Sequence, residues 1–110
     1  MIAQHDRYVL SSAVISLPGE YRYRLIPVGS AKRWLQRGGF VSSIGYGMTA
    51  DAMGVLLGVR PPVQRQVIKM KAGDEALVFR LKLRVTDTSI TLTPDLVREH
   101  IEIGLLKRTA

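Results

Sequence analysis

Apolar residues recur along this chain with two different periods, which predicts both strands and helices. Alternating or β-branched stretches predict five strands, at residues 7–15, 20–28, 64–71, 75–85 and 101–107. The first is expected in the interior of a sheet, while Pro27 indicates that the second ends there or lies at an edge. The strand over residues 75–85 has the strongest pattern. A turn at Ala72, Gly73 and Asp74 is expected before it and a polar connection at residues 86–89 after it.

Helical spacing predicts three short helices, at residues 30–37, 49–57 and 93–100. Ser30 and Thr49 are expected to cap the first two, and Thr93 is expected to cap the third because a proline follows it. The order of elements therefore predicts a single α/β domain over residues 1–110, with a mixed sheet of about five strands and three short helices. Strand adjacency does not follow from this order.

The composition is that of an ordinary globular protein with an excess of positive charge. The 110 residues are 46% hydrophobic and 23% charged, and sixteen Lys and Arg against nine Asp and Glu leave a net charge of +7. This charge favours an anionic partner. Cysteine is absent and only His5 and His100 could supply imidazole, so no metal or other cofactor is expected. Without a signal-peptide core or a long apolar run, the protein is expected in a cytoplasm.

One face of the strand over residues 75–85 carries a row of cations. The period of two brings Arg80, Lys82 and Arg84 together, opposite the apolar residues of the same strand. The row is either a solvated face or a site where a phosphate or a carboxylate relieves the repulsion between like charges.

A glycine-rich loop, SSIGYGMT, leads into the second predicted helix. Gly45 and Gly47 permit a close approach or an unusual backbone conformation, and Tyr46 lies between them. A helix N-terminus presents unpaired N–H groups that can hold a phosphate. The alternative is a glycine-rich turn with an aromatic anchor, because short glycine motifs are weak evidence.

Three longer runs carry a resemblance to a known family. They are GFVSSIGYGMTADAMGVLLGV, then PVQRQVIKMKAGDEALVFRLKLRV, then TLTPDLV before a final strand. Over residues 8–107 the chain resembles the viral anti-CRISPR ring nucleases, first met in archaeal viruses and also present in phages and bacteria. The resemblance implies a two-fold homodimer that binds cyclic tetra-adenylate, the second messenger of type III CRISPR defence. Members cleave this ring without a metal. The resemblance implies no cofactor, and neither a membrane nor duplex nucleic acid as a partner. A viral member would act in the host cytoplasm.

The resemblance also assigns residues to the site. The family's catalytic histidine, a general acid for the leaving 5′-oxygen, falls on Tyr46, while its phosphate-stabilising arginine and neighbouring acidic residue fall on Arg84 and Asp87. A further family arginine matches Arg65. The ligand-binding set implied in this way is Ser11, Ser12, Ser43, Ile44, Gly45, Gly47, Thr49, Arg65 and Arg80. Met48 stands where the family commonly has a small or polar residue.

The tyrosine at position 46 separates three hypotheses. An unperturbed histidine titrates near pH 6.5 and a tyrosine near 10, so Tyr46 is a poorly matched proton donor at neutral pH. The leading hypothesis is a protein that sequesters the ring with slow or absent cleavage. The second is an active ring nuclease that leaves linear di-adenylate with a 2′,3′-cyclic phosphate. The third, based on charge alone, is a small basic module that binds nucleic acid or protein.

Overall fold

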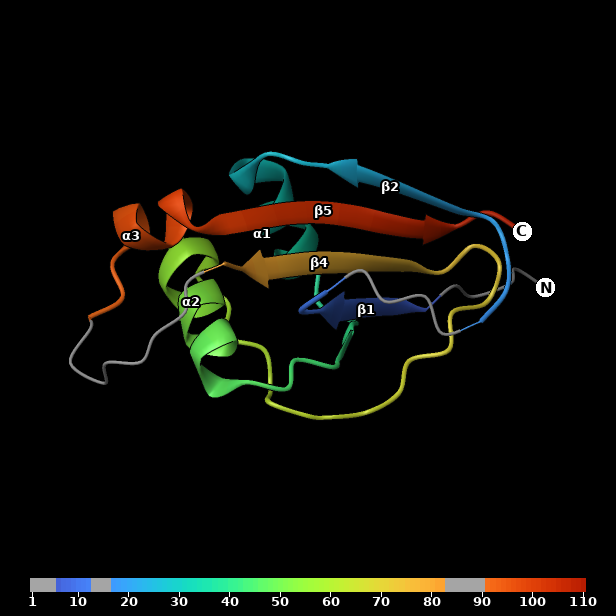
Figure 1. The fold of residues 1–110 in the computed structure, drawn as a ribbon, viewed down its shortest axis with the longest axis horizontal. Helices are drawn as coiled ribbons and strands as arrows, with labels where there is room; N and C mark the ends of the chain where they lie inside the picture. The colour runs from blue at the N-terminus through green and yellow to red at the C-terminus, as the bar shows by residue number, and fades with distance from the viewer. Residues whose placement is uncertain (1–5, 13–16, 83–90) are drawn as a thin grey trace.

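Five strands form one mixed sheet in the order β2-β5-β4-β1-β3 (Figure 1). The computed structural model describes residues 6–12, 17–82 and 91–110. The strands are β1 (Arg7–Leu10), β2 (Tyr21–Leu25), β3 (Val41–Ser42), β4 (Glu75–Leu81) and β5 (Ile101–Arg108). The helices are α1 (Val28–Gln36), α2 (Gly47–Leu57) and α3 (Pro94–Glu99). The predicted fold class, a mixed sheet of five strands with three short helices, is confirmed.

The two neighbours of β1 run parallel to it. Tyr8 pairs with Val41 of β3 and with Ala76 of β4, whereas β5 runs antiparallel to both β4 and β2. The interior position of the first strand and the edge position of the second are therefore confirmed. Because β1, β3 and β4 are parallel, their carboxyl ends lie at one end of the sheet, which is where open α/β sheets bind ligands.

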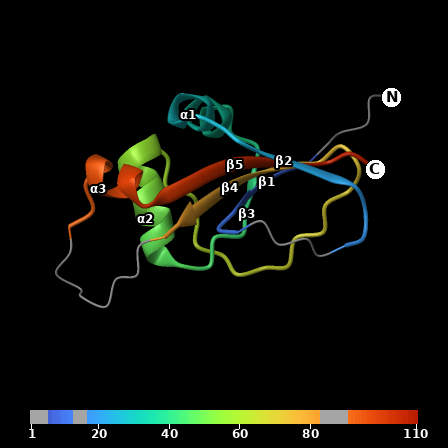
Figure 2. The same cartoon turned by 45° about the horizontal axis from the view of Figure 1, so that its top comes forward.

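The sheet has a core on each face. α1 covers one face, and α2 and α3 pack at the end of the sheet where β4 finishes (Figure 2). Apolar side chains of these helices, such as Trp34 and Leu57, meet Val9, Leu77 and Phe79 from the sheet. On the other face the chain between α2 and β4 runs along the sheet, and its Met70 packs with a smaller cluster of Tyr8, Leu10, Ala76, Val78 and Leu106.

The helix ends show where local signals are reliable. Gly58 ends α2 in the left-handed conformation (φ 78°), and the Thr93 hydroxyl accepts a hydrogen bond from Leu96 N at 3.2 Å at the start of α3, as predicted. The prediction that Thr49 caps α2 is wrong. The helix begins at Gly47 with Tyr46 at the N-cap, because the Ala50 N–H already closes a turn onto Tyr46 O (3.2 Å).

The first helix also begins earlier than predicted, at Val28 rather than Ser30. Pro27 takes the extended N-cap position, and its carbonyl accepts the Ala31 N–H at 3.1 Å. Ala31, Trp34 and Leu35, which recur at helical spacing, are buried. Among the described residues, no helix has the length and apolar character needed to cross a membrane.

The predicted strand over residues 64–71 is wrong. Val63 makes an isolated parallel bridge with Ile44, and the two-residue β3 takes the sheet edge beside β1 instead. Beyond Gln64, whose N–H donates to Ile44 O at 2.9 Å, side chains rather than a ladder supply the hydrogen bonds to the neighbouring loop. The apolar alternation of this segment therefore reflects packing against the sheet and not membership of it.

A buried carboxylate holds the far end of that segment. Asp74 is fully buried, and its two oxygens accept from Asp6 N and Lys71 N, each at 2.8 Å. Gly73 forms the turn with a φ of 94°, as the Ala-Gly-Asp turn predicted. Burial, with added repulsion from Asp6 and Asp74, raises the pKa of the nearby Tyr8 to about 12. The turn before β4 and the start of β1 are therefore joined by one side chain.

Gly104 has a packing role in β5. The Tyr23 ring from β2 lies directly over it, and a Cβ at this position would fall well inside van der Waals contact with the tip of that ring. An aromatic side chain that covers a glycine on the neighbouring strand replaces the packing that the glycine lacks.

We predict that Gly104→Ala has opposite effects in two backgrounds. In the natural sequence the new methyl expels the Tyr23 ring, and the free energy of unfolding falls by about 1 kcal/mol. In a Tyr23→Ala background the same change stabilises, by roughly 0.5–1 kcal/mol, because alanine loses less backbone entropy than glycine. Chemical denaturation of the four proteins of this double-mutant cycle gives both values. Equal effects in the two backgrounds would refute the packing of Tyr23 on Gly104.

Candidate functional site

Two loops meet beyond the carboxyl ends of β1 and β3. Ser11 and Ser12 follow β1, and Ser43 follows β3. These three side chains, predicted as ligand contacts from distant parts of the sequence, line one hollow of about 270 Å³. The full lining is Leu10, Ser11, Ser12, Ser43, Gln66, Val67 and Ile68. The structure therefore brings the predicted serines together at the ligand-binding end of the parallel strands.

The loop after β3 is fixed by hydrogen bonds to residues 62–66. The Ser42 hydroxyl donates to Pro62 O and the Ser43 hydroxyl donates to Gln66 O, both at 2.6 Å. In return, the Gln66 side-chain amide donates to Ser42 O at 2.7 Å. Sequence reasoning missed Gln66. The only signal was its place next to Arg65 in the motif QRQ, which indicates that the two side chains point in different directions.

Gly45 is where the loop permits a close approach, and the group that approaches is Arg65. The Arg65 Nε donates to Gly45 O at 3.0 Å, and a Cβ on Gly45 would lie 3.2 Å from Arg65 Cγ. The other glycine differs, since an added Cβ on Gly47 would meet nothing within 4 Å and its φ is not positive. Of the two glycines, Gly45 therefore has the steric role.

Tyr46 stands at the start of α2 with Arg65 beside it. Its side chain is 62% exposed, and the Arg65 Cζ lies 5.1 Å from the ring centre, within the range of a cation–π contact. Within the described residues no side chain caps α2, so N–H groups of its first turn remain available to a ligand. An exposed aromatic ring, a guanidinium and a helix N-terminus thus lie together.

Two predicted contacts have their side chains inside the protein. Ile44 is fully buried and Thr49 is nearly so. Ile44 packs in the core cluster that joins the sheet to the helices. Neither side chain is therefore open to a ligand, and the Ile44 N–H and carbonyl already bond to the Ser42 hydroxyl and to Gln64 N. Met48, which departs from the family pattern, is exposed beside Tyr46.

The cationic row is partly neutralised. Arg80 forms an ion pair with Glu102 on β5 at 2.8 Å, so a carboxylate relieves the expected repulsion at this position. Arg80 follows Val78 by two residues, as Ser12 follows Leu10, and Val78 and Leu10 are partners in the sheet. Arg80 therefore lies at the same end of the sheet as the hollow. Arg84 and Asp87 lie outside the described residues, as does His5.

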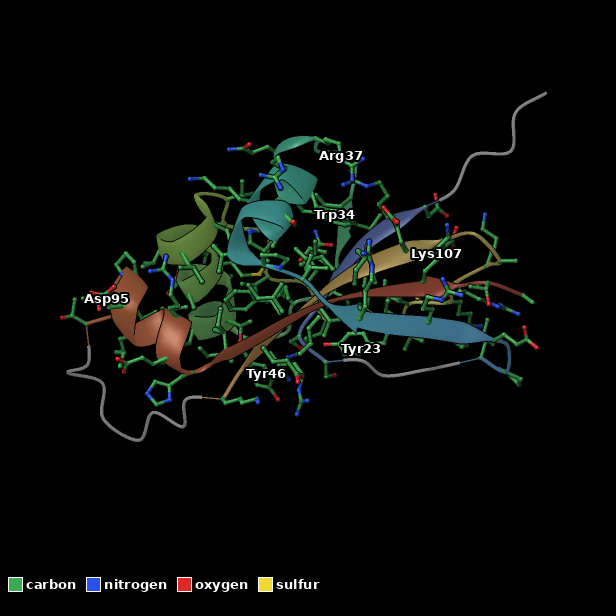
Figure 3. The ribbon with its side chains drawn as sticks, turned by 90° about the horizontal axis from the view of Figure 1, so that it is seen from above. Tyr23, Trp34, Arg37, Tyr46, Asp95 and Lys107 are labelled. Carbon is green, nitrogen blue, oxygen red and sulfur yellow. The ribbon has the colours of Figure 1, made fainter. Side chains whose placement is uncertain are left out.

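His100 is the C-cap residue of α3. Its carbonyl accepts the Lys82 N–H at 2.6 Å and its own N–H donates to Val97 O at 3.0 Å. In the described part of the chain no contact joins its imidazole to Tyr46. Figure 3 shows Tyr46 on the same side of the sheet as Tyr23 and on the opposite side from Trp34 and Arg37.

Comparison with known proteins finds relatives in viruses and bacteria. The family model described as STIV B116-like matches residues 7–104. The uncharacterized protein ORF117 of Acidianus two-tailed virus is 31% identical over 91 residues, which span 78% of each chain. The uncharacterized protein YddF of Bacillus subtilis (strain 168) is 30% identical over 101 residues, which span 90% of this chain and 94% of that one.

A solved structure has the same fold. B116 of Sulfolobus turreted icosahedral virus superposes with a TM-score of 0.80 over 94% of this chain and 99% of its own. The two sequences are 16% identical, so this likeness concerns the fold alone. An archaeal viral relative and a bacterial one agree with the distribution expected of the family that the sequence resembles.

Proposed function

The chain belongs to the STIV B116-like family, and on that premise we propose that it is a homodimer that binds a cyclic oligoadenylate of the cyclic tetra-adenylate class. Sequestration of this second messenger, with slow or absent cleavage, antagonises or tunes type III CRISPR signalling. The ligand class comes from the resemblance of the sequence to the ring nucleases, and the candidate site supplies groups that suit it.

The observation that carries the proposal is the Arg65 guanidinium beside the exposed Tyr46 ring, at the start of α2. A nucleotide offers a flat base and a phosphate. An aromatic ring can stack on the base, a guanidinium can pair with the phosphate, and free N–H groups of a helix N-terminus favour an anion. The hydroxyls of Ser11 and Ser12 in the adjoining hollow can bind the ribose or base edges.

Apolar side chains that remain exposed support the homodimer. Among the described residues they include Tyr23, Leu25, Tyr46, Val63 and Val67, each at least 37% exposed. The sheet register puts Tyr23 and Leu25 on the face opposite α1, which is the face along which the chain containing Val63 and Val67 runs. A two-fold dimer through this face would present Tyr46 and Arg65 twice to a ring with two-fold symmetry.

Cleavage requires a proton for the 5′-oxygen that leaves when the ribose 2′-hydroxyl attacks the phosphate. In the proposed site Arg84 and Arg65 stabilise the charge on that phosphate and Asp87 is the acidic catalytic residue that the resemblance assigns, while Tyr46 stands in the position of the general acid. Tyrosine is a weak acid at neutral pH. Since a matched general acid contributes about a hundredfold to ten-thousandfold, its loss reduces turnover by that order and leaves binding intact.

The direct test is calorimetric titration with cyclic tetra-adenylate, followed by chromatography of the same sample after an hour. The expected result is one ring bound per dimer and recovered intact. Linear di-adenylate formed over multiple turnovers would contradict sequestration and would indicate an active ring nuclease. If the ring did not bind and duplex DNA or RNA bound with a strong salt dependence, the protein would instead be the small basic module that its charge of +7 allows.

Arg65→Gln is expected to weaken ring binding by about tenfold or more, because it removes a charge-assisted hydrogen bond to phosphate. Arg60→Gln is the matched control. It removes the same charge from an exposed arginine that pairs with Asp51 at 2.7 Å, so ring affinity should change less than about twofold. Calorimetry of both variants measures this, and equal losses would mean that only the general positive field attracts the ring.

Tyr46→His is expected to raise the single-turnover cleavage rate by about a hundredfold to ten-thousandfold, because it supplies an acid matched to neutral pH. The rate should then fall as pH rises through the pKa of the new histidine. Tyr46→Phe, which keeps the ring and removes the hydroxyl, should bind cyclic tetra-adenylate nearly as well as the natural protein. A Tyr46→His variant that binds the ring and still leaves it intact would show that the acid is not what limits cleavage.

A further inference from the structure

A second and larger cleft lies between α1 and β2, on the side of the sheet away from Tyr46. Its volume is about 810 Å³, within the size range of small-molecule sites. Figure 3 shows Trp34 and Arg37, two of its lining residues, across the sheet from Tyr46. The hollow with the three serines and this cleft share no lining residue, so the two are separate.

Three arginines line the cleft, and none of them pairs with a carboxylate in the described part of the chain. Arg24 comes from β2, while Arg33 and Arg37 come from α1 and its C-cap. Elsewhere in the described residues, Arg60 and Arg80 each hold a carboxylate at 2.7 and 2.8 Å. Arg33 has one weak neutral contact, to the Ser30 hydroxyl at 3.4 Å. The cleft therefore concentrates three uncompensated positive charges.

The one acidic residue that lines the cleft is already engaged. Glu75 accepts a hydrogen bond from Trp34 Nε1 at 2.9 Å and lies 3.9 Å from Arg7 Nε. Arg7 itself donates to the carbonyls of Trp34 and Gly38, which cap the end of α1. Burial first, and then the charge of Arg37, lower the pKa of the Arg7 guanidinium. Glu75 thus offsets Arg7 and leaves Arg24, Arg33 and Arg37 to an external anion.

The cleft is suited to a chain of charges rather than to a single ion. Arg33 and Arg37 are one helical turn apart, so their side chains leave α1 as neighbours, and Arg24 approaches from β2. Guanidinium groups bind phosphate oxygens through paired N–H donors. Beside them lie an apolar wall of Ile26, Pro27 and Leu105 and the polar side chains of Ser30 and Gln36. The apolar wall beside these three arginines also fits a ligand with a flat, less polar end.

We infer that the cleft between α1 and β2 binds a ligand with a linear polyphosphate chain, either as a nucleoside triphosphate or as the free polyphosphate. Arg24, Arg33 and Arg37 hold the phosphate oxygens, and the apolar wall receives the nucleoside where one is present. This inference does not depend on the proposed binding of a cyclic oligoadenylate, because the two sites lie on opposite faces of the sheet.

The test uses ATP and inorganic triphosphate as probes. Trp34 is the single tryptophan of the chain and lines the cleft, so its emission reports on this site alone, while calorimetry gives the affinity. The expected result is saturable binding with a change in Trp34 emission. Replacement of both Arg33 and Arg37 by Gln should weaken binding by about tenfold or more. Replacement of both Arg60 and Arg98 by Gln removes two charges outside the cleft and should change affinity less than about twofold.

The outcomes distinguish a nucleotide ligand from a free polyphosphate and define the results that would contradict the inference. ATP that binds more tightly than triphosphate indicates a nucleotide ligand, and equal affinities indicate the polyphosphate chain alone. Equal losses in the two double variants would overturn the inference, since binding would then follow net charge. Absence of saturable binding at millimolar concentrations would also overturn it. So would displacement of ATP by cyclic tetra-adenylate, because the probe would then occupy the site at Tyr46. The four arginines are exposed, and thermal melting checks that each variant stays folded.

Discussion

The candidate site depends on a segment that side chains fix in place, without a strand ladder among the described residues. Residues 62–71 run along the sheet and are fixed at both ends by side chains: Ser42, Ser43 and Gln66 near Tyr46, and the buried Asp74 carboxylate at the other end. An unpaired buried carboxylate costs far more than a paired one, so Asp74 strongly favours the turn that satisfies it. Because the segment is held in this way, Arg65 reaches the loop at Gly45 and stands beside Tyr46.

Arginine side chains lie on both faces of the sheet, and the two groups differ in how the protein engages them. On the face away from α1, Arg80 pairs with Glu102 and Arg65 bonds to a backbone carbonyl, so each guanidinium is oriented by the protein. On the face with α1, Arg24, Arg33 and Arg37 surround a cleft whose acidic residue serves Arg7 and Trp34. A net charge of +7 is therefore not spread evenly as solubilising charge, and it can serve two anionic ligands independently.

Much of the fold could be predicted from local signals, and the failures have a common cause. The buried face of α1, the end of α2 at Gly58 and the Thr93 cap follow from the spacing and chemistry of adjacent residues. The strand over residues 64–71 failed because alternation reports burial and not hydrogen-bond partners, and β3, only two residues long, is too short for a periodic pattern. In the site, the shared hollow of Ser11, Ser12 and Ser43 depends on the parallel pairing of β1 with β3, which single-sequence reasoning could not supply.

The residue at position 46 can change the chemistry of the site without moving its cation. Arg65 has a hydrogen bond to the Gly45 carbonyl that does not depend on the side chain at position 46, and its segment is fixed through Gln66. A protonated imidazole there would face a guanidinium, and the repulsion between like charges would lower the pKa of the histidine and make it a stronger acid. A neutral tyrosine instead attracts the guanidinium to its ring, at 5.1 Å. The same scaffold therefore favours proton transfer with histidine and an oriented aromatic–guanidinium pair with tyrosine.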